Sequence, residues 1–496
     1  MFKRHRKPLL SIYDFITPFG GHLNEENRWV VMANAIDWDY IDEVYEKSFT
    51  KDKTVGNVAY DSRIAFGALC IQKKLDLMDA ETVEMIQENP YLQYFLGYHE
   101  YSYDKPFDSS TMVYFRKRFS EDVMNDINEH HFKDRANGGG SGSSNDEDES
   151  VTETDDTKNS GTLIIDATCA PADIAYPTDL ELADKARGWT EDIFDFLYLT
   201  LGNYTEDGIK PRTYREIARK RFLNLNKRNK KSQKQVRKEL RYQLNCIERN
   251  IGYINHYDLS ELPRIMMERY STIRIFLEQQ REMLEGNKHY VKDRIVSLAQ
   301  LWIRPIVRGK AKAKTEFGTK LSISVVNGYT FIDRLSFDAY NEGDYEEFTS
   351  AVELYRKRFG CYPGRIFADK IYRSRKNREY CKEHGIRMSG PKLGKPKADN
   401  SADIAIELKE IGERNEVEGK FGTAKRKYGL NLIKANLEET ARTDICMNLF
   451  VENLDHQIRG DLRFFSLSLF QIFERFIDYR PVIFDWQIHK GLFSKP

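Results

Sequence analysis

Acidic residues that follow short apolar runs are the first candidates for chemistry in this chain. Asp166 closes the run TLIID and Asp369 closes GRIFAD. A carboxylate that ends a buried strand is costly to place there unless something pairs it. If the two strands are neighbours, the two carboxylates repel each other, and a divalent cation relieves the repulsion. A third carboxylate would complete a two-metal site for phosphodiester chemistry. For either aspartate alone, capping of the following turn is the simpler interpretation.

The segment ERNEVEGKFGTAKRKYGL, residues 413–430, offers the third carboxylate on a predicted helix. Acids early in a helix complement its dipole, and Glu416 with Lys420 forms an ordinary i,i+4 pair. Glu416 and Glu418 flank the apolar stripe, which is formed by Val417, Phe421, Ala424 and Tyr428.

The neighbours of the two glutamates differ. Those of Glu416 form a solvated set: Lys420, Thr423 and Lys427. Those of Glu418 are Arg414, Gly422, Lys425 and Gly429. The glycines leave room for a backbone or ligand, and Arg414 and Lys425 are expected to hold DNA phosphates. Glu418 is therefore the better metal-ligand candidate.

Composition bounds the class of protein. The 496 residues carry 77 Lys and Arg against 77 Asp and Glu, so any basic surface must be local. None of the six cysteines forms a C-x-x-C pair, which argues against a zinc ribbon. No apolar stretch reaches about 18 residues, so we expect no membrane span and a cytoplasmic protein.

The composition and the apolar pattern of the sequence change along the chain. Residues 1–136 are expected to form a helical DNA-binding domain, and the acidic Gly/Ser-rich residues 137–160 a flexible linker. Residues 161–186 and 302–455 are predicted to form one α/β core, interrupted by a basic helical insertion, residues 187–301. Residues 456–496 are predicted to form a C-terminal helical tail.

The predicted core alternates strands and helices. TLIIDAT is a strand, KLSISVV and YTFIDRL form a hairpin around Asn327-Gly328, and residues 345–360 form an amphipathic helix. GRIFADK is a further strand, followed by a helix, a strand and the helix of residues 413–430. This order predicts a mixed α/β sheet.

Two basic segments are candidates for binding DNA. Residues 210–249 hold 15 Lys and Arg against 3 Glu, and Lys227, Arg228, Lys230 and Lys231 form their densest group. A solvated coiled-coil arm is the alternative, but such local charge favours a polyanion. The second segment, DSSTMVYFRKRF, is a predicted helix that carries Arg116 and Arg118. DNA binding by these arginines and a basic helix face in contact with water explain the pattern equally well.

Taken together, LIIDAT, FADKIYRSRKN and NEVEGKFGTAKRKYGL resemble the DDE transposases of bacterial insertion sequences, and so do VRGKAKAKTEFGTK and FDSSTMVYFRKR. The resemblance covers nearly the whole chain except the linker and about the last forty residues. It implies a ribonuclease-H-like catalytic fold. Asp166, Asp369 and Glu418 would bind two Mg²⁺ ions, with Mn²⁺ as a substitute.

The same resemblance implies cleavage and joining of DNA strands at the terminal inverted repeats of an insertion sequence. Expected partners are repeat DNA, target DNA and a second copy of the chain, and the expected location is the cytoplasm, in association with the nucleoid. A site-directed nuclease of the same fold and a non-catalytic DNA-binding derivative are the alternatives. The acidic linker is longer than the family pattern.

Overall fold

The computed structural model describes residues 11–18, 20–49, 58–138, 159–307, 315–390 and 401–477. The predicted linker, residues 137–160, lies almost entirely outside the described residues. For residues 401–404 and 462–477 only the backbone is described.

The chain begins with short helices, as the sequence predicts. They are η1 (Ile12–Asp14), α1 (Arg28–Ala35), α2 (Trp38–Lys47), α3 (Ser62–Leu75), α4 (Asp79–Glu88), α5 (Pro90–Phe95), α6 (Thr111–Arg118) and α7 (Glu121–Ala136). Polar caps fix several starts, because a side-chain oxygen satisfies a backbone N–H that has no helical partner. Asn27 accepts from the N–H of Trp29, and Asp37 from that of Tyr40.

The central sheet is mixed and has six strands, which confirms the predicted α/β class. They are β1 (Thr162–Pro171), β2 (Arg304–Val307), β3 (Thr315–Val326), β4 (Tyr329–Ser336), β5 (Arg365–Phe367) and β6 (Arg387–Met388). The order is β2-β3-β1-β5-β6, with β4 also paired to β3. The β3–β4 hairpin turns at Asn327 and Gly328, which have φ of 47° and 81°. Both central residues thus adopt the left-handed conformation typical of a tight hairpin.

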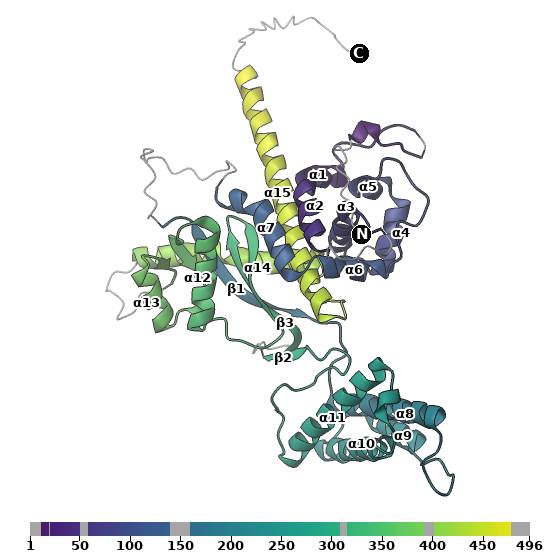
Figure 1. Ribbon diagram of the computed structural model, residues 1–496. Coiled ribbons are helices and arrows are strands. Elements are labelled where there is room, and N and C mark those ends of the chain that lie inside the picture. The colour runs from purple at the N-terminus through teal and green to yellow at the C-terminus, as the bar shows by residue number, and fades with distance from the viewer. Residues whose placement is uncertain are drawn as a thin grey trace, which may run out of the picture.

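Helices lie around this sheet (Figure 1). They are α12 (Tyr345–Phe359), η3 (Lys370–Tyr372), α13 (Arg375–Glu383), α14 (Ser401–Lys427) and α15 (Glu438–Ile477). Helix α14 packs on β1, β3 and β5, whereas α15 packs on β4, α14 and the N-terminal helices. The long helix α15 therefore lies between the sheet and the N-terminal helices (Figure 1).

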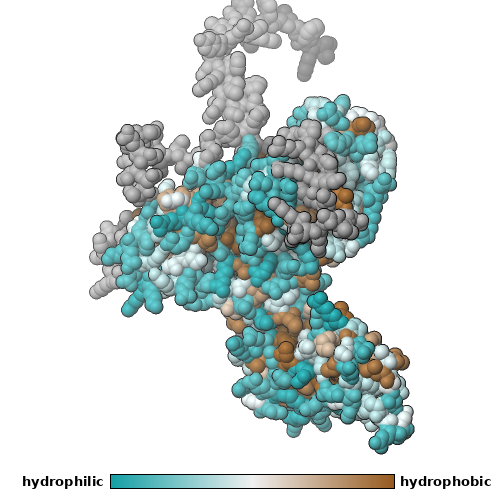
Figure 2. Space-filling model, in the orientation of Figure 1, coloured by the Kyte–Doolittle hydropathy of each residue, from teal (hydrophilic) through white to brown (hydrophobic). Residues whose placement is uncertain are grey.

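The insertion between β1 and β2 is a separate helical lobe (Figure 1). Its helices are α8 (Asp179–Leu201), α9 (Arg215–Asn226), α10 (Gln233–Ile254), η2 (Leu259–Glu261) and α11 (Arg264–Glu285). They share their own apolar cluster, which includes Phe194, Leu244, Ile247 and Phe276. Figure 2 shows hydrophobic side chains also on the visible surface of this lobe.

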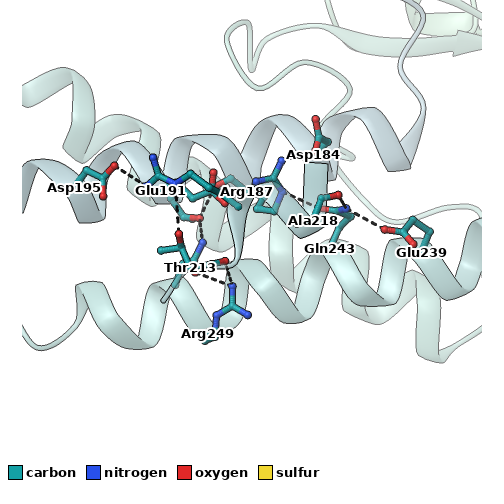
Figure 3. A network of polar contacts seen from close by, with 12 residues as sticks. Asp184, Arg187, Glu191, Asp195, Thr213, Ala218, Glu239, Gln243 and Arg249 are labelled. Atoms are coloured by element: carbon teal, nitrogen blue, oxygen red, sulfur yellow. Dashed lines mark hydrogen bonds and ion pairs between the residues drawn. The ribbon is translucent and has the colours of Figure 1, made fainter. Parts of the chain in front are cut away.

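A buried polar network ties the insertion helices together (Figure 3). Arg187 of α8 pairs with Asp184 at 2.6 Å and with Glu191 at 2.5 Å, and donates to Gln243 of α10 at 2.9 Å. Gln243 donates to the carbonyl oxygen of Ala218 on α9 at 3.0 Å. Because buried charges need partners, this network fixes the register of three helices.

The N-terminal helices share one apolar core with the sheet. Phe66 of α3 makes edge contacts with Phe119 and Phe450, each with ring centroids 5.2 Å apart. Phe132 of α7 stacks on Tyr329 of β4 with ring centroids 5.5 Å apart. These helices are thus packed against the sheet and its helices. The division into domains expected from the sequence stays a prediction.

Arg116 belongs to this packing. It is 6% exposed, and its guanidinium pairs with Asp79 and, at 3.1 Å, with Asp444 of α15. The prediction that Arg116 binds DNA does not fit this burial, since its charge is satisfied inside the protein. Arg118 is half-buried, lies over the ring of Phe49 and donates to the carbonyl oxygen of Ser48. A part in packing fits Arg118 better too.

Among the described residues, no helix is long and apolar enough to cross a membrane.

Removing the Arg116 charge should destabilise the protein. Arg116→Met leaves the buried Asp444 with Lys73, at 2.9 Å, as its remaining ion-pair partner among the described residues, and should lower the free energy of unfolding by about 3 kcal/mol. Lys117→Met removes the neighbouring, exposed charge and should change it by less than about 0.5 kcal/mol. Chemical denaturation measures both variants. Equal effects would show that the Arg116 cluster does not hold the N-terminal helices in place.

Candidate active site

Strand pairing brings Asp166 and Asp369 to the same part of the sheet. Strands β1 and β5 are parallel neighbours, with Ile164 opposite Phe367. Asp166 follows Ile164 by two residues, and Asp369 follows Phe367 by two residues. The expected adjacency of the two strands is confirmed. Asp166 does not close its strand, however, because β1 continues to Pro171 against β3.

Asp369 lies just beyond β5 and caps η3. Its carboxylate accepts a hydrogen bond from the backbone N–H of Lys370 at 2.7 Å. The capping interpretation of this residue is thus correct, yet its side chain is still 57% exposed and also faces a cation of α14.

Glu418 lies on α14, whose apolar stripe faces the core. Val417 and Ala424 are fully buried, and Tyr428 and Phe421 nearly so. The helix begins at Ser401, so the glutamates of residues 413–418 lie in its middle rather than its first turns. The helix-dipole explanation for these acids was therefore wrong, because the dipole acts only near helix ends.

The glycines beside Glu418 do not open a space for a ligand. A side-chain carbon on Gly429 would lie 2.7 Å from the carboxylate of Asp76, and one on Gly422 would lie 3.3 Å from the guanidinium of Arg426. Neighbouring side chains already take up that room.

Arg414 joins two of the three acids. Its Nη1 lies 3.4 Å from Oδ1 of Asp369, and its Nη2 lies 3.5 Å from Oε1 of Glu418. A single guanidinium therefore sits between the carboxylate after β5 and the carboxylate of α14. Sequence spacing placed Arg414 near Glu418, and the fold adds Asp369 to the same group.

Lys425 connects α14 to β1. Its Nζ donates to Oγ1 of Thr168 at 2.9 Å. Thr168 follows Asp166 by two residues, and side chains two apart in a strand point to the same face. The structure thus brings Asp166 and Lys425 to one face of the sheet, with α14 above it.

Arg373, which the sequence reasoning did not single out, also belongs to this region. Burial lowers the pKa of its guanidinium, and the nearby charges of Arg378 and Arg414 lower it further, whereas Glu407 and Asp369 oppose the shift. Arg373 lies in the stretch FADKIYRSRKN, where the only signal was its density of basic residues. A positive flank therefore lies next to Asp369.

A cavity of about 240 Å³ adjoins Asp166, and its other lining residues include Ser322, Asp333, Glu342 and Tyr372. Burial raises the pKa of Asp333 to about 6, although Arg358 at 3.6 Å opposes the shift. Nothing in the sequence marked Asp333, because strands β3 and β4 and the β-bulge between them bring it here.

The flank of α14 that carries Glu416 is not simply solvated. Glu416 is exposed, but Lys420 is half-buried and faces Glu452 of α15, which is 1% exposed. Burial lowers the pKa of Lys420 and raises that of Glu452 to about 7. The predicted solvated set was therefore wrong for Lys420, because α15 covers it.

The donor set at the three acids suits a divalent cation. Carboxylate oxygens are its preferred ligands, and a positive charge already lies between two of them. The described part of the chain contains no group of three His, Cys, Asp or Glu placed closely enough to hold a metal ion. The side chains would have to close around an ion to bind it.

Two family comparisons bear on this geometry. Residues 366–455 match the family described as "Transposase DDE domain", and residues 18–118 match "Transposase domain (DUF772)". The chain is a transposase of the DDE class. The first match contains Asp369, Arg414, Glu418 and Lys425, and the second contains helices α1 to α6.

The transposase is also similar to a curated protein, "Uncharacterized protein ORF8 in nfe locus" of Rhizobium meliloti. The two are 29% identical over 164 residues, which is 33% of this chain and 71% of the relative. No solved structure matches.

These matches establish the general function of the protein. The transposase carries out DNA transposition as an enzyme of an insertion sequence, and it binds DNA. The ribonuclease-H-like α/β fold is confirmed, and a DDE domain implies a divalent metal ion.

The basic group of the insertion lies away from the sheet, at the turn between α9 and α10. Lys227, Arg228, Lys230 and Lys231 are all exposed there, and Lys231 donates to Asn226 at 2.7 Å. Because these cations face solvent, they are available to a polyanion.

The buried Glu452 predicts a pH dependence of stability. Between about pH 4.5 and 7 the folded state keeps a proton on Glu452 that the unfolded state has lost. Stability therefore falls as the pH rises through this window, by about 3 kcal/mol relative to Glu452→Gln. Chemical denaturation at pH 4.5 and 7.5 measures the difference.

The exposed Glu379→Gln serves as the control, and should stay within about 0.5 kcal/mol of the parent at both pH values. A constant gap between the parent and Glu452→Gln across this range would contradict the assignment of the shift to Glu452.

Proposed function

We propose that this transposase cuts and joins DNA strands at the terminal inverted repeats of its insertion sequence, using Asp166, Asp369 and Glu418 as metal-binding carboxylates. The observation that carries the proposal is the shared position of these residues. The β1–β5 register aligns the two aspartates, and Arg414 joins Asp369 to Glu418. Two Mg²⁺ ions, or Mn²⁺ in their place, would activate the attacking hydroxyl and stabilise the leaving oxygen.

Each carboxylate has a distinct place in this proposal. Asp166 lies inside a long strand and pairs with Ile323 of β3, whereas Asp369 lies beyond its strand and Glu418 is exposed on a helix, so Asp166 is the most rigidly placed of the three. That position suits the ligand shared by both ions. Asp369 and Glu418 are more than half exposed and suit one ion each.

Cations beside the acids would hold the DNA backbone. Lys425 reaches β1 next to Asp166, and Arg373 and Arg414 lie near Asp369. Guanidinium and ammonium groups bind phosphate oxygens strongly. The DNA would thus cross the face formed by β1 and α14, and the exposed cations of the insertion would hold a more distant stretch.

Oligomeric state and location also belong to this proposal. The transposase would act as a homodimer, one copy for each end of the element, and it would associate with the nucleoid in the cytoplasm. A site-directed nuclease without strand transfer remains the alternative, and products joined to target DNA separate the two.

Neutralising a single acid should abolish chemistry without loss of DNA binding. Glu418→Gln keeps the shape and removes the charge that a divalent ion needs, so cleavage of labelled repeat DNA in Mg²⁺ should cease. Asp166→Asn and Asp369→Asn should behave alike, because the three acids act as one site. Binding of the same DNA, measured on the same samples, should persist.

The matched control is Glu416→Gln, on the opposite flank of α14. Its side chain is exposed, and the loss of its interaction with Lys420 should cost at most about 1 kcal/mol of stability. This variant should cut normally. If it loses cleavage while Glu418→Gln still cuts, the metal ligand on α14 is Glu416 and not Glu418. If both variants cut normally, α14 does not supply a metal ligand.

The basic turn of the insertion should contribute to DNA affinity irrespective of sequence. Exchanging Lys227, Arg228, Lys230 and Lys231 for Gln should weaken binding to all DNA sequences and flatten the salt dependence, since fewer counterions are released. A salt titration of DNA binding measures both effects. The control exchanges four exposed cations elsewhere on the protein: Lys47, Lys133, Arg356 and Lys357. If the two sets give equal slopes, the insertion turn is only a solvated surface.

A further inference from the structure

The position of Arg414 raises a question about charge at the active site. Its two terminal nitrogens face two different carboxylates, those of Asp369 and Glu418, at 3.4 and 3.5 Å. A guanidinium that only anchored α14 would need one partner. Here one monovalent cation is shared by two acids that are expected to take a divalent one.

Such an arrangement has a physical reason. Carboxylates from β5 and α14 repel when the fold brings them together, and a cation between them reduces that repulsion. Arg414 is 22% exposed, whereas the two acids are 57% and 59% exposed. The pairs are therefore weak, because water screens them. A divalent ion, with twice the charge and direct coordination, can replace the arginine.

The arginine and the metal ion cannot share the position, since both are positive. A displaced Arg414 stays beside Arg373, so that two arginines lie together next to Asp369. Arginine binds phosphate in the same forked geometry in which it binds carboxylate. Displacement would therefore turn the guanidinium toward the DNA backbone.

We propose that Arg414 is the resident counter-ion of Asp369 and Glu418, and that metal binding displaces it toward a DNA phosphate. Metal binding and DNA binding are then coupled through one side chain, each favouring the other. This inference rests on the proposed function, since it takes both acids as metal ligands.

Mn²⁺ binding to the full-length protein without DNA tests the proposal, with free Mn²⁺ followed by electron paramagnetic resonance. Arg414→Gln removes the competing charge and should tighten Mn²⁺ binding roughly three- to tenfold. Arg414→Lys should fall between this variant and the parent, because an ammonium meets only one acid at a time. The control Lys427→Gln removes an exposed charge from the last turn of the same helix and should bind Mn²⁺ as the parent does.

Asp369→Asn and Glu418→Gln separate this inference from the proposed function. If both lose Mn²⁺ binding while Arg414→Gln binds no more tightly than the parent, the counter-ion role is wrong and the metal site stands. If the acid variants bind Mn²⁺ as well as the parent, the metal site is wrong and the inference falls with it. Should Arg414→Gln fail to fold, unchanged or weaker binding by Arg414→Lys overturns the proposal.

A second measurement tests the coupling. Ca²⁺, which binds carboxylates, should raise the affinity of the parent for repeat DNA, and it should raise that of Arg414→Gln less. An equal gain in the two proteins would show that Arg414 does not carry the coupling.

Discussion

The parallel pairing of β1 with β5 is the constraint on which the active site depends. Only three residue pairs form this contact, from Thr162–Arg365 to Ile164–Phe367, yet they align Asp166 with Asp369. A shift of β1 by one residue would turn Asp166 to the opposite face of the sheet, away from Asp369, because side chains alternate along a strand. The surrounding structure prevents such a shift. Strand β3 holds β1 over its other edge, and the apolar residues on both faces of the sheet are buried.

Helix α14 supplies the remaining part of the site, and it is held from two sides. Its apolar stripe packs on the sheet, while Lys420 faces the buried Glu452 of α15. The helix that carries Glu418 therefore depends on α15, and α15 in turn is packed against the N-terminal helices through Phe66, Phe450 and the Arg116–Asp444 pair. A change in the N-terminal helices can reach the proposed metal ligands through this path, because close-packed protein interiors transmit strain.

The basic side chains fall into two groups, those that pair with acids inside the protein and those that face solvent. Inside the protein, Arg116, Arg187 and Arg358 pair with acids and fix the positions of helices. At the surface, the cations of the insertion turn face solvent: Lys227, Arg228, Lys230 and Lys231. This division explains how a chain with no net charge can still bind a polyanion. Its cations and acids are equal in number but are not mixed evenly over the surface.

The sequence by itself determined the class of fold, the hairpin at Asn327-Gly328 and the apolar stripe of α14. Each depends on local pattern: the conformations that Asn and Gly accept, and the period of apolar residues. The sequence also proposed the three acids, from their local contexts. Only the tertiary structure decided that Arg116 is buried, that α15 covers Lys420 and that Arg414 lies between Asp369 and Glu418. Those facts depend on contacts between residues far apart in the chain, Arg116 with Asp444 and Lys420 with Glu452 among them, and no local pattern encodes which distant surface will cover a charged side chain.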